Sequence, residues 1–461
     1  MKDKRIVVAV KYCKGELNPF DGAALECALQ SGAKEVIAVS MAPMSALNAF
    51  QGLTRLGVKC VLISDPVYAG SDTQATCGVL AKAIKRLYPD LIFCGRQSVD
   101  GDTAQVPPML AQTLGFRIFT KVAAMEETQN GLRLVLRGGE RIAPENGTIF
   151  TFERFKTLRF PSMFSRLGEV EVWDNSVLQI PLEKCGLDGS TTRVIKSYES
   201  SVGRRFCKFT TIAELDGLIK AGLEKVNETR AVETGEKLDE AYFVGEVEAV
   251  ANSVAKKAIP LNVTGRTPEE IAKEFVEKGV KTVLWEDSDA LKTLAARVAV
   301  LTDAGLCADC ISFRVEGGRF IMTRPAFGGN ITADIVNTGK IAFATVRTVK
   351  RGGSDLVFTV GKGGVAYLDK ITALAARYGA EICASRIVVD IGKMPYETQV
   401  GLTGKSVSPK VYVAFGVSGA VQHTCAIAGA GTVIAVNVDK TARIFDYADF
   451  GIVEDIKNLP L

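Results

Sequence analysis

The sequence has 461 residues, of which 47% are hydrophobic and 23% charged, a balance typical of globular proteins and unlike long disordered chains. Fifty-six basic and 52 acidic side chains leave a formal charge of +4, too small to indicate a nucleic-acid-binding protein. The chain has one histidine, His423, which excludes a metal site built from several histidines and any mechanism that needs two imidazoles.

Short apolar runs alternate with helical patterns at the start of the chain. Strands are predicted at Arg5–Val10, Glu35–Ser40, Cys60–Asp65 and Asp90–Gly95, and helices at Ala23–Ser31, Met44–Leu56, Thr73–Leu87 and Ala104–Leu114. Continuous Val, Ile and Leu runs suit strands buried on both faces, with helices as crossovers, so a doubly wound α/β sheet is expected. Leu132–Arg137 and Thr148–Glu153 alternate in polarity and predict an antiparallel addition to it.

The second half repeats this organisation after a polar segment. Residues 227–240 are charged and lack periodicity, which is typical of a linker. Helices are predicted at Ala241–Ala255, Thr267–Glu277 and Leu368–Tyr378, and strands at Lys281–Trp285, Asp355–Val360, Lys410–Phe415 and Thr432–Asn437. The last 110 or so residues therefore form a second α/β unit.

Targeting and thiol patterns favour a cytoplasmic protein. The apolar run before Lys11 is too short for a signal peptide, and no run reaches the roughly 18 apolar residues that span a membrane. Eleven cysteines lack the spacing of a disulfide framework, which favours reduced thiols. Cys307 and Cys310 have C-x-x-C spacing but no second pair, so we expect packed thiols rather than a metal site.

Three glycine-rich loops follow predicted strands of the last unit: Gly361–Gly364, Gln399–Pro409 and the turn before His423. Ser418 is expected to cap the helix that contains His423, which would place free backbone N–H groups at a strand end. Loops that converge on one edge of a parallel sheet predict an extended ligand such as a dinucleotide. The alternative is that they are ordinary turns between strands and helices.

These residues also carry a family resemblance. Residues 383–451, RPAFGGN at 324–330 and ATVRT at 344–348 resemble the alpha subunit of electron transfer flavoproteins. LNPFDGAALE at 17–26, VIAVSM at 36–41, AGSDTQAT at 69–76, CGRQSVDGDTAQV at 94–106 and GLDGSTTRV at 186–194 resemble the beta subunit. The chain therefore resembles a single-chain fusion of a beta subunit followed by an alpha subunit.

The resemblance implies four parts: a beta-like nucleotide-binding domain over 1–226, a linker over 227–240, a shortened alpha-subunit amino-terminal domain over 241–350, and an alpha-subunit FAD-binding domain over 351–461. The expected fold class is α/β, with two Rossmann-like, doubly wound parallel-sheet halves and a C-terminal FAD-binding α/β domain.

The resemblance also implies which residues bind FAD. They are Lys362, Ser385, Arg386, Gln399, Val400, Gly401, Leu402, Thr403, Ser418, Gly419, Ala420, Val421, Gln422, His423, Asn437 and Asp455. Arg386 is expected over the isoalloxazine ring, where a fixed cation favours the reduced, anionic flavin. Thr403 is expected at the flavin N(5), and His423 is expected to donate to the pyrimidine carbonyl. Lys362 stands where the family usually has Arg, and Leu402 where it commonly has Gln.

A second nucleotide, AMP or a second FAD, is implied for the beta-like half. Its residues would be Ala9, Asn18, Met41, Ser98, Asp100, Gly101, Asp102, Thr103, Ala104, Gln105 and Val106. The segment between Lys11 and Leu17 is shorter than is usual in the family, so we expect a hairpin near this site to be missing. A retained loop that binds no nucleotide is the alternative.

The expected function is that of a soluble, FAD-dependent electron carrier that shuttles electrons between a dehydrogenase and another redox protein. No acid–base residue for substrate conversion is assigned. Expected partners are redox proteins, such as a flavin dehydrogenase, with a ferredoxin or NADH as candidate donors, and neither nucleic acid nor a membrane span is expected. One alternative is an electron-bifurcating flavoprotein with two FADs that oxidises NADH. The other is a non-redox, nucleotide-binding regulatory protein.

Overall fold

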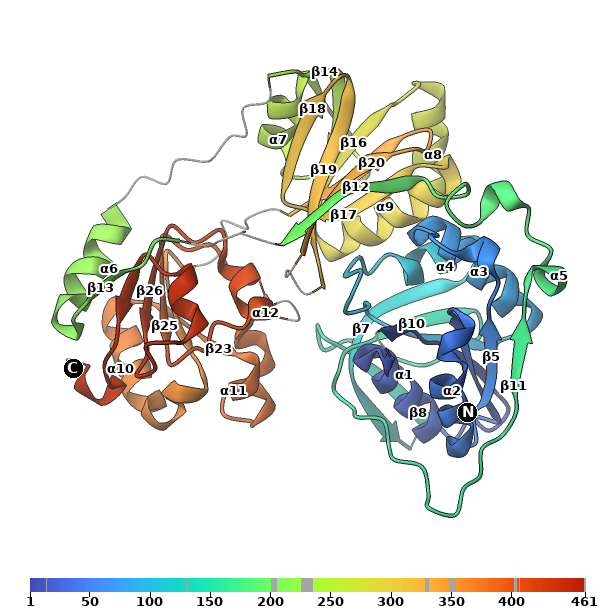
Figure 1. Cartoon of the computed structure of the whole chain (residues 1–461), viewed down its shortest axis with the longest axis horizontal. Coiled ribbons are helices and arrows are strands. Elements are labelled where there is room, and N and C mark those ends of the chain that lie inside the picture. The colour runs from blue at the N-terminus through green and yellow to red at the C-terminus, as the bar shows by residue number, and fades with distance from the viewer. Residues whose placement is uncertain are drawn as a thin grey trace. The chain divides into compact units, whose positions relative to one another are not determined.

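The computed structural model describes residues 1–13, 15–129, 131–199, 205–224, 235–327, 331–347, 354–401, 404–405 and 407–459. The chain divides into two compact units (Figure 1). The first comprises Met1–Ser197, Val232–Phe327 and Ala333–Arg347, and the second comprises Tyr198–Ala231, Gly328–Thr332 and Thr348–Leu461.

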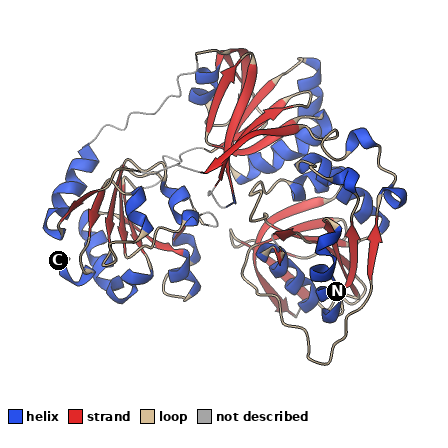
Figure 2. Cartoon of the chain, in the orientation of Figure 1, coloured by secondary structure: helices blue, strands red, loops and turns tan. Residues whose placement is uncertain are grey.

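The first unit begins with a nine-stranded sheet in the order β11-β5-β4-β1-β6-β10-β7-β8-β9. The strands are β1 (Arg5–Ala9), β4 (Glu35–Met41), β5 (Lys59–Ile63), β6 (Leu91–Gly95), β7 (Arg117–Thr128), β8 (Gly131–Leu136), β9 (Arg141–Ile142), β10 (Thr148–Phe152) and β11 (Val170–Trp173). The helices include α1 (Pro19–Gln30), α2 (Leu47–Gln51), α3 (Thr73–Arg86), α4 (Val106–Leu114) and α5 (Asn175–Leu178). Figure 2 shows helices around this sheet.

One strand of this sheet corrects a prediction. Only β8 and β9 extend the sheet in antiparallel fashion, whereas β10 pairs in parallel with β6 and β7. All five β10 residues are buried, because the strand lies inside the sheet with both faces covered. The polarity of Thr148 and Thr151 suggested a solvated face that the fold does not have.

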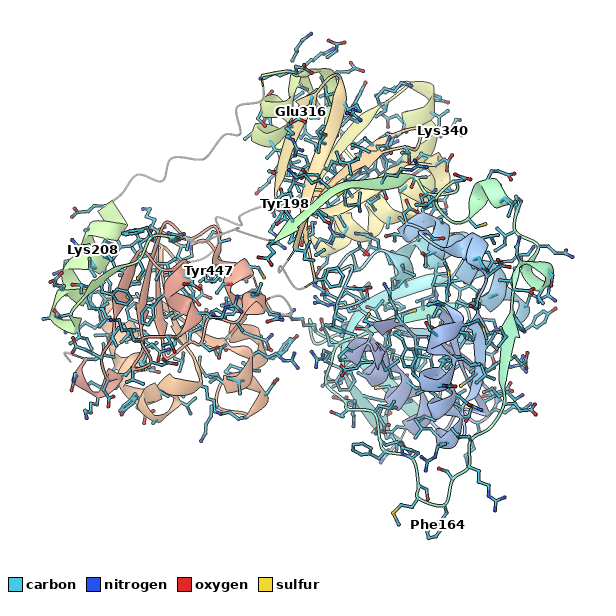
Figure 3. All side chains as sticks on the ribbon, in the orientation of Figure 1. Phe164, Tyr198, Lys208, Glu316, Lys340 and Tyr447 are labelled. Carbon is cyan, nitrogen blue, oxygen red and sulfur yellow. The ribbon has the colours of Figure 1, made fainter. Side chains whose placement is uncertain are left out.

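The segment between β10 and β11 carries Phe164 at its tip (Figure 3).

The rest of the first unit contains a five-stranded and a four-stranded sheet. The five-stranded sheet has the order β15-β14-β16-β21-β17, formed by β14 (Leu238–Val244), β15 (Ala255–Pro260), β16 (Thr282–Glu286), β17 (Gly305–Cys310) and β21 (Ala342–Val346). Helices α7 (Glu248–Val254), α8 (Pro268–Glu277) and α9 (Asp289–Thr302) connect its strands. The other sheet, β12-β20-β19-β18, contains Thr192–Glu199, Ile331–Asn337, Arg319–Ala326 and Ser312–Glu316 in that order.

The predicted helix at Ala241–Ala255 is wrong in its first part. Residues 241–244 lie in β14, where Ala241, Tyr242, Phe243 and Val244 are all buried. Consecutive buried aromatic and branched residues favour a strand over a helix with one polar face, and the helix begins only at Glu248. The last three residues of the predicted linker, 238–240, also belong to β14.

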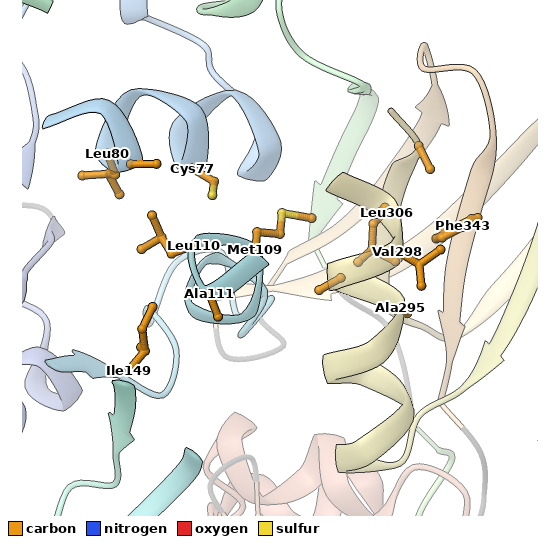
Figure 4. Close-up of a cluster of buried hydrophobic side chains, with 14 of the residues drawn as sticks. Cys77, Leu80, Met109, Leu110, Ala111, Ile149, Ala295, Val298, Leu306 and Phe343 are labelled. Carbon is orange, nitrogen blue, oxygen red and sulfur yellow. The ribbon is translucent and has the colours of Figure 1, made fainter. Parts of the chain in front are cut away.

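An apolar cluster joins the parts of the first unit. Met109 and Leu110 of α4 lie between α3 and α9 (Figure 4), and Phe343 of β21 belongs to the same buried cluster. Leu110 and Val298 are fully buried. The beta-like sheet and the five-stranded sheet therefore share one hydrophobic core.

The second unit is built on a sheet in which every strand pair is parallel, in the order β13-β27-β26-β25-β22-β23-β24. The strands are β13 (Lys208–Thr210), β22 (Leu356–Val360), β23 (Glu381–Ser385), β24 (Gln399–Val400), β25 (Val411–Phe415), β26 (Thr432–Val436) and β27 (Phe450–Ile452). Helices α6 (Leu215–Glu224) and α10 (Leu368–Tyr378) pack on one face. The 3-10 turns Cys425–Ile427 and Arg443–Tyr447 pack on the other. Two further helices are α11 (Arg386–Asp390) and α12 (Val421–Thr424).

The packing divides the chain differently from the boundary expected at residue 226. Strand β13 pairs with β27, and Ile212, Leu215 and Ile219 join the core of the second unit. Arg205 forms an ion pair with Asp449 in the same unit. A three-residue strand gives too little sequence signal to reveal this pairing, and the four sequence-based domains stay a prediction.

The α/β fold class is confirmed. Within the described parts of the chain, no helix combines the length and the apolar character needed to cross a membrane.

Candidate functional site

The candidate site in the second unit lies along the carboxyl edge of its parallel sheet. Strands β27, β26, β25, β22, β23 and β24 are neighbours in that order, and each ends at this edge. The predicted residues follow those strand ends: Asp455, Asn437, Ser418–His423, Lys362, Ser385–Arg386 and Gly401. Six strands at the usual spacing span roughly 24 Å, a length suited to an extended ligand.

The middle of this edge is the point where the strand order reverses. Strand β22 leads to β23 on one side, and its neighbour β25 leads to β26 on the other. In open α/β sheets, ligands bind outside the carboxyl ends of strands at such a point. The two loops touch there: the Gly361 amide donates to the Phe415 carbonyl at 2.8 Å, and the Gly363 amide donates to the Gly416 carbonyl at 3.1 Å.

Only glycines permit this close approach. A Cβ on Gly361 would lie 2.2 Å from the Gly416 carbonyl oxygen, and Gly416 itself has a φ of +63°. Gly419 is equally constrained, with a φ of +83° and a would-be Cβ 2.0 Å from the Ile444 nitrogen. The glycine-rich turn is therefore required by the crossing of two backbones, whatever it binds.

His423 lies on α12 with its imidazole buried. Its Nε2 is 2.7 Å from the Tyr412 hydroxyl, and Tyr412 is fully buried on β25. Its Nδ1 is buried and has no hydrogen-bond partner. Burial lowers the pKa of His423 to about 4, and the backbone of Val400 partly offsets that shift. The imidazole is therefore neutral at pH 7, with one nitrogen left to meet a ligand.

The loop after β24 packs against α12. A Cβ on Gly401 would lie 3.1 Å from the Gln422 carbonyl, and the Lys405 amide donates to the Gln399 carbonyl at 2.8 Å. The structure thus brings Gln399, Val400 and Gly401 together with Gln422 and His423. Leu402 and Thr403, both predicted flavin contacts, lie outside the described residues.

Ser385 and Arg386 mark the end of β23. The Ser385 hydroxyl is buried without a hydrogen-bond partner. The Arg386 side chain is 41% exposed, and its Nε donates to Asp390 at 3.2 Å. Lys362 is exposed at the start of the loop after β22. These two cations therefore add positive charge to the edge, and one of them is partly neutralised.

Two predicted ligand contacts already hold the local backbone. The Asn437 side-chain amide donates to the Val417 carbonyl at 3.0 Å, and Asp455 accepts from the Lys457 amide at 2.9 Å. Ser418 does not cap a helix, because α12 begins at Val421 and its N-cap is Ala420. With only four residues, α12 also has too small a dipole to bind an anion at its start.

The protonation of His423 gives a testable pH dependence. Its pKa is near 6.5 when unfolded and about 4 when buried, so protonation favours the unfolded state between these values. The apoprotein should lose roughly 3 kcal/mol of stability as the pH falls through that window. His423→Gln should remove this loss, whereas carboxylates titrate alike in both proteins. Urea unfolding followed by circular dichroism checks this, and equal slopes would contradict burial of the imidazole.

A second candidate site lies at the carboxyl edge of the nine-stranded sheet. Ala9 ends β1, Met41 ends β4, and the segment Ser98–Val106 connects β6 to α4. Asn18 is buried, and its side-chain oxygen has no hydrogen-bond partner. Gln105 is 2% exposed, and neither atom of its amide group has a partner. Buried, unpaired amide groups are costly, so they indicate a missing polar ligand.

The loop at this second site is held in strained conformations. Asp102 and Ala104 have φ angles of +51° and +55°, which non-glycine residues rarely adopt. Asp100 forms an ion pair with Lys11 at 2.7 Å. Burial would raise the pKa of Asp100, but Lys11 lowers it to about 2. The nearby hairpin expected to be missing is present in short form, because Tyr12 and Cys13 pair with Leu17 and Glu16.

Sequence reasoning missed two buried groups at these edges. Tyr412 lies under His423, and Asp21 accepts from the Lys11 amide at 2.8 Å and from the Gly95 amide at 3.0 Å. Burial raises the pKa of Asp21 to about 7. A polar residue inside an otherwise apolar strand, as in VYVAF, could have indicated Tyr412. In the described ranges, no group of three or more potential metal ligands occurs.

Comparisons with known proteins match both parts of the chain. The electron transfer flavoprotein domain family matches residues 6–138 and 225–350, and the electron transfer flavoprotein FAD-binding domain matches residues 352–428. The chain is 32% identical over 233 residues to electron transfer flavoprotein subunit alpha of Thermoanaerobacterium thermosaccharolyticum, covering 41% of this chain and 70% of that protein.

Further relatives match as well. Electron transfer flavoprotein subunit beta of Clostridium acetobutylicum is 33% identical over 198 residues, which cover 40% of this chain and 76% of that protein. Acryloyl-CoA reductase electron transfer subunit beta of Anaerotignum propionicum is 28% identical over 329 residues, which cover 52% of this chain and 89% of that protein. Similarity to both subunits, with the FAD-binding domain last, agrees with a beta–alpha fusion.

Proposed function

Because the chain belongs to the electron transfer flavoprotein family, we propose that it carries electrons on one FAD between a dehydrogenase and another redox protein. The observation that carries this proposal is that the sequence matched by the FAD-binding domain folds into the glycine-lined carboxyl edge of the second unit. When bound there, FAD would supply the electron chemistry, while the protein supplies position and charge.

The residues at this edge fit a flavin dinucleotide. His423 Nδ1 and Ser385 Oγ are buried and unpaired, so they suit the polar rim of a flavin ring. Gly361 and Gly416 leave the strand ends open to a ligand, and the Arg386 guanidinium supplies a cation beside it. These residues would bind and orient the ring and exclude water from its pyrimidine side. A neutral His423 cannot add charge, so Arg386 would supply the fixed positive charge there.

The nucleotide content of the purified protein tests this proposal. Acid release followed by chromatography should give at least one FAD per chain. A protein that is colourless and takes up no FAD would exclude electron carriage and favour the non-redox alternative. Two FADs per chain, together with reduction by NADH, would favour the bifurcating alternative.

The beta-like half is proposed to hold a second nucleotide, AMP or FAD. Support comes from the unpaired side-chain oxygen of Asn18 and the unpaired amide group of Gln105 at the carboxyl edge of the nine-stranded sheet. Gln105→Leu should release this nucleotide from the purified protein and leave the FAD of the second unit in place. The matched control is Gln112→Leu on α4, the helix that Gln105 precedes, because Gln112 already donates to Glu269 at 2.7 Å.

Gln105→Leu also distinguishes a site that binds a nucleotide from one that is empty. If no nucleotide binds, replacing an unsatisfied buried amide by an apolar group should stabilise the protein by about 1 kcal/mol or more. Stabilisation without any change in nucleotide content would therefore contradict a second nucleotide.

The segment between β10 and β11 is proposed to dock the redox partner. Phe160, Met163 and Phe164 are 94%, 89% and 91% exposed, and Figure 3 shows Phe164 at the tip. The base of this segment is fixed, because Arg159 forms four hydrogen bonds to the buried carboxylate of Glu26. An exposed apolar tip on a fixed base suits a protein partner.

Phe164→Glu should slow FAD reduction by the cognate dehydrogenase at least tenfold, because an acidic group would be buried at the contact. FAD content and potential should not change. Leu182→Glu, the same kind of change at another exposed residue of the first unit, is the control. Equal rates for both variants, measured by stopped-flow absorbance, would exclude this segment as the docking surface.

The eleven thiols without disulfides suit a reducing compartment such as the cytoplasm.

A further inference from the structure

Tyr412 contacts the one histidine at the proposed flavin site. The Tyr412 hydroxyl lies 2.7 Å from His423 Nε2, and the pair sits below the carboxyl edge where β25 leads into α12. His423 Nδ1 is buried without a partner. An imidazole with one nitrogen engaged by the protein and the other unpaired presents one hydrogen-bonding group to a ligand, and its partner decides whether that group donates or accepts.

The neutral imidazole of His423 has two tautomers, protonated at Nε2 or at Nδ1, and they leave different numbers of buried groups without a hydrogen bond. If Nε2 carried the proton and donated to the tyrosine oxygen, both the tyrosine O–H and the Nδ1 lone pair would need other partners. If the tyrosine O–H donates to Nε2, only one group, Nδ1–H, remains unpaired. Burial keeps the tyrosine protonated, because it raises the pKa of Tyr412 well above the ordinary value. Unsatisfied buried groups are costly, so the second arrangement is favoured.

The neighbouring strand carries a second hydroxyl on the same face of the sheet. Val357 of β22 pairs with Tyr412, so Thr359, two residues further on, lies on that face. The Thr359 hydroxyl is buried without a hydrogen-bond partner, so the hydrogen bond that the structure gives the Tyr412 hydroxyl is the one to His423 Nε2.

We propose that Tyr412 is a positioning residue that holds His423 in the tautomer protonated at Nδ1, so that this nitrogen donates a hydrogen bond to a carbonyl of the flavin. This inference rests on the proposed FAD site, since it names the group that meets the ligand there. The protein would thereby fix a neutral donor, which accepts no proton from solvent at pH 7. Neither residue transfers a proton in this arrangement.

Selective ¹⁵N labelling of histidine tests the proposal directly, because the chain has one histidine and each ring nitrogen gives one signal. Long-range ¹H–¹⁵N spectra of the apoprotein should show protonated Nδ1 and unprotonated Nε2. Tyr412→Phe, which removes only the hydroxyl, should shift the population toward protonated Nε2. The control is Tyr378→Phe, because that hydroxyl donates to Asp216 in the same unit, and it should leave the histidine spectrum unchanged.

Adding FAD separates this proposal from the proposed function. FAD should move the Nδ1 signal more than the Nε2 signal, and Tyr412→Phe should weaken FAD binding about tenfold. Protonated Nε2 in the wild-type apoprotein, or no change in Tyr412→Phe, would overturn the proposal. So would FAD uptake that leaves Nδ1 unmoved. A protein that takes up no FAD but has protonated Nδ1 would contradict the proposed flavin function. It would still support the role of Tyr412 in fixing the tautomer of His423.

Discussion

Gly361→Ala should destabilise the second unit by at least about 2–3 kcal/mol and weaken FAD binding more than tenfold. The added Cβ would lie 2.2 Å from the Gly416 carbonyl oxygen and 2.5 Å from the Val417 Cα. These are backbone atoms, so no side chain can rotate away, and the ends of β22 and β25 must separate. That separation distorts the carboxyl edge along which we propose that the dinucleotide binds.

Two internal controls make this result specific. Gly217→Ala, on α6 of the same unit with no atom within 4 Å of the new Cβ, should be neutral or stabilise by roughly 0.5–1 kcal/mol. Both tryptophans, Trp173 and Trp285, belong to the first unit, so fluorescence-detected unfolding should stay unchanged in both variants. Circular dichroism reports on both units, so a transition that it shows and tryptophan fluorescence does not belongs to the second unit. Equal stability and equal FAD affinity for Gly361→Ala and wild type would contradict this prediction. They would mean that the loops after β22 and β25 can move apart without cost.

Arg386→Ala should lower the reduction potential of bound FAD by tens of millivolts. A fixed cation beside the ring stabilises the negative charge that reduction adds, and about 1.4 kcal/mol corresponds to roughly 59 mV for one electron. Arg386 follows β23 at the carboxyl edge, where its side chain forms an ion pair with Asp390. Spectroelectrochemical titration of the reconstituted protein measures the potential.

A variant of the Arg386–Asp390 ion pair is expected to shift the reduction potential in the opposite direction. Asp390→Asn removes the negative charge that partly neutralises Arg386 and should therefore raise the potential. The pair of variants separates charge from packing, because a general loosening of the site would shift both potentials in the same direction. An unchanged potential in Arg386→Ala with FAD still bound would place the guanidinium away from the flavin.

Much of the fold is visible in the sequence because buried parallel strands have a strong local signature. Runs such as RIVVA at 5–9 and VYVAF at 411–415 are almost wholly apolar, and each is followed by glycine or polar residues and a helix. The failures lie where tertiary context overrides that signature. Residues 241–244 read as a helix and form β14, and Thr148–Phe152 read as antiparallel and form a parallel strand inside the sheet.

By itself, the sequence determined the α/β class, the fused beta–alpha order and the family, because these depend on local periodicity and on contiguous motifs. Only the tertiary structure decided that β13 pairs with β27 in the sheet of the second unit, that the loops of Gly361 and Gly416 touch, and that Tyr412 contacts His423. These are contacts between residues distant in sequence. Strand order and backbone crossing set them, and a linear pattern of residue types does not record either.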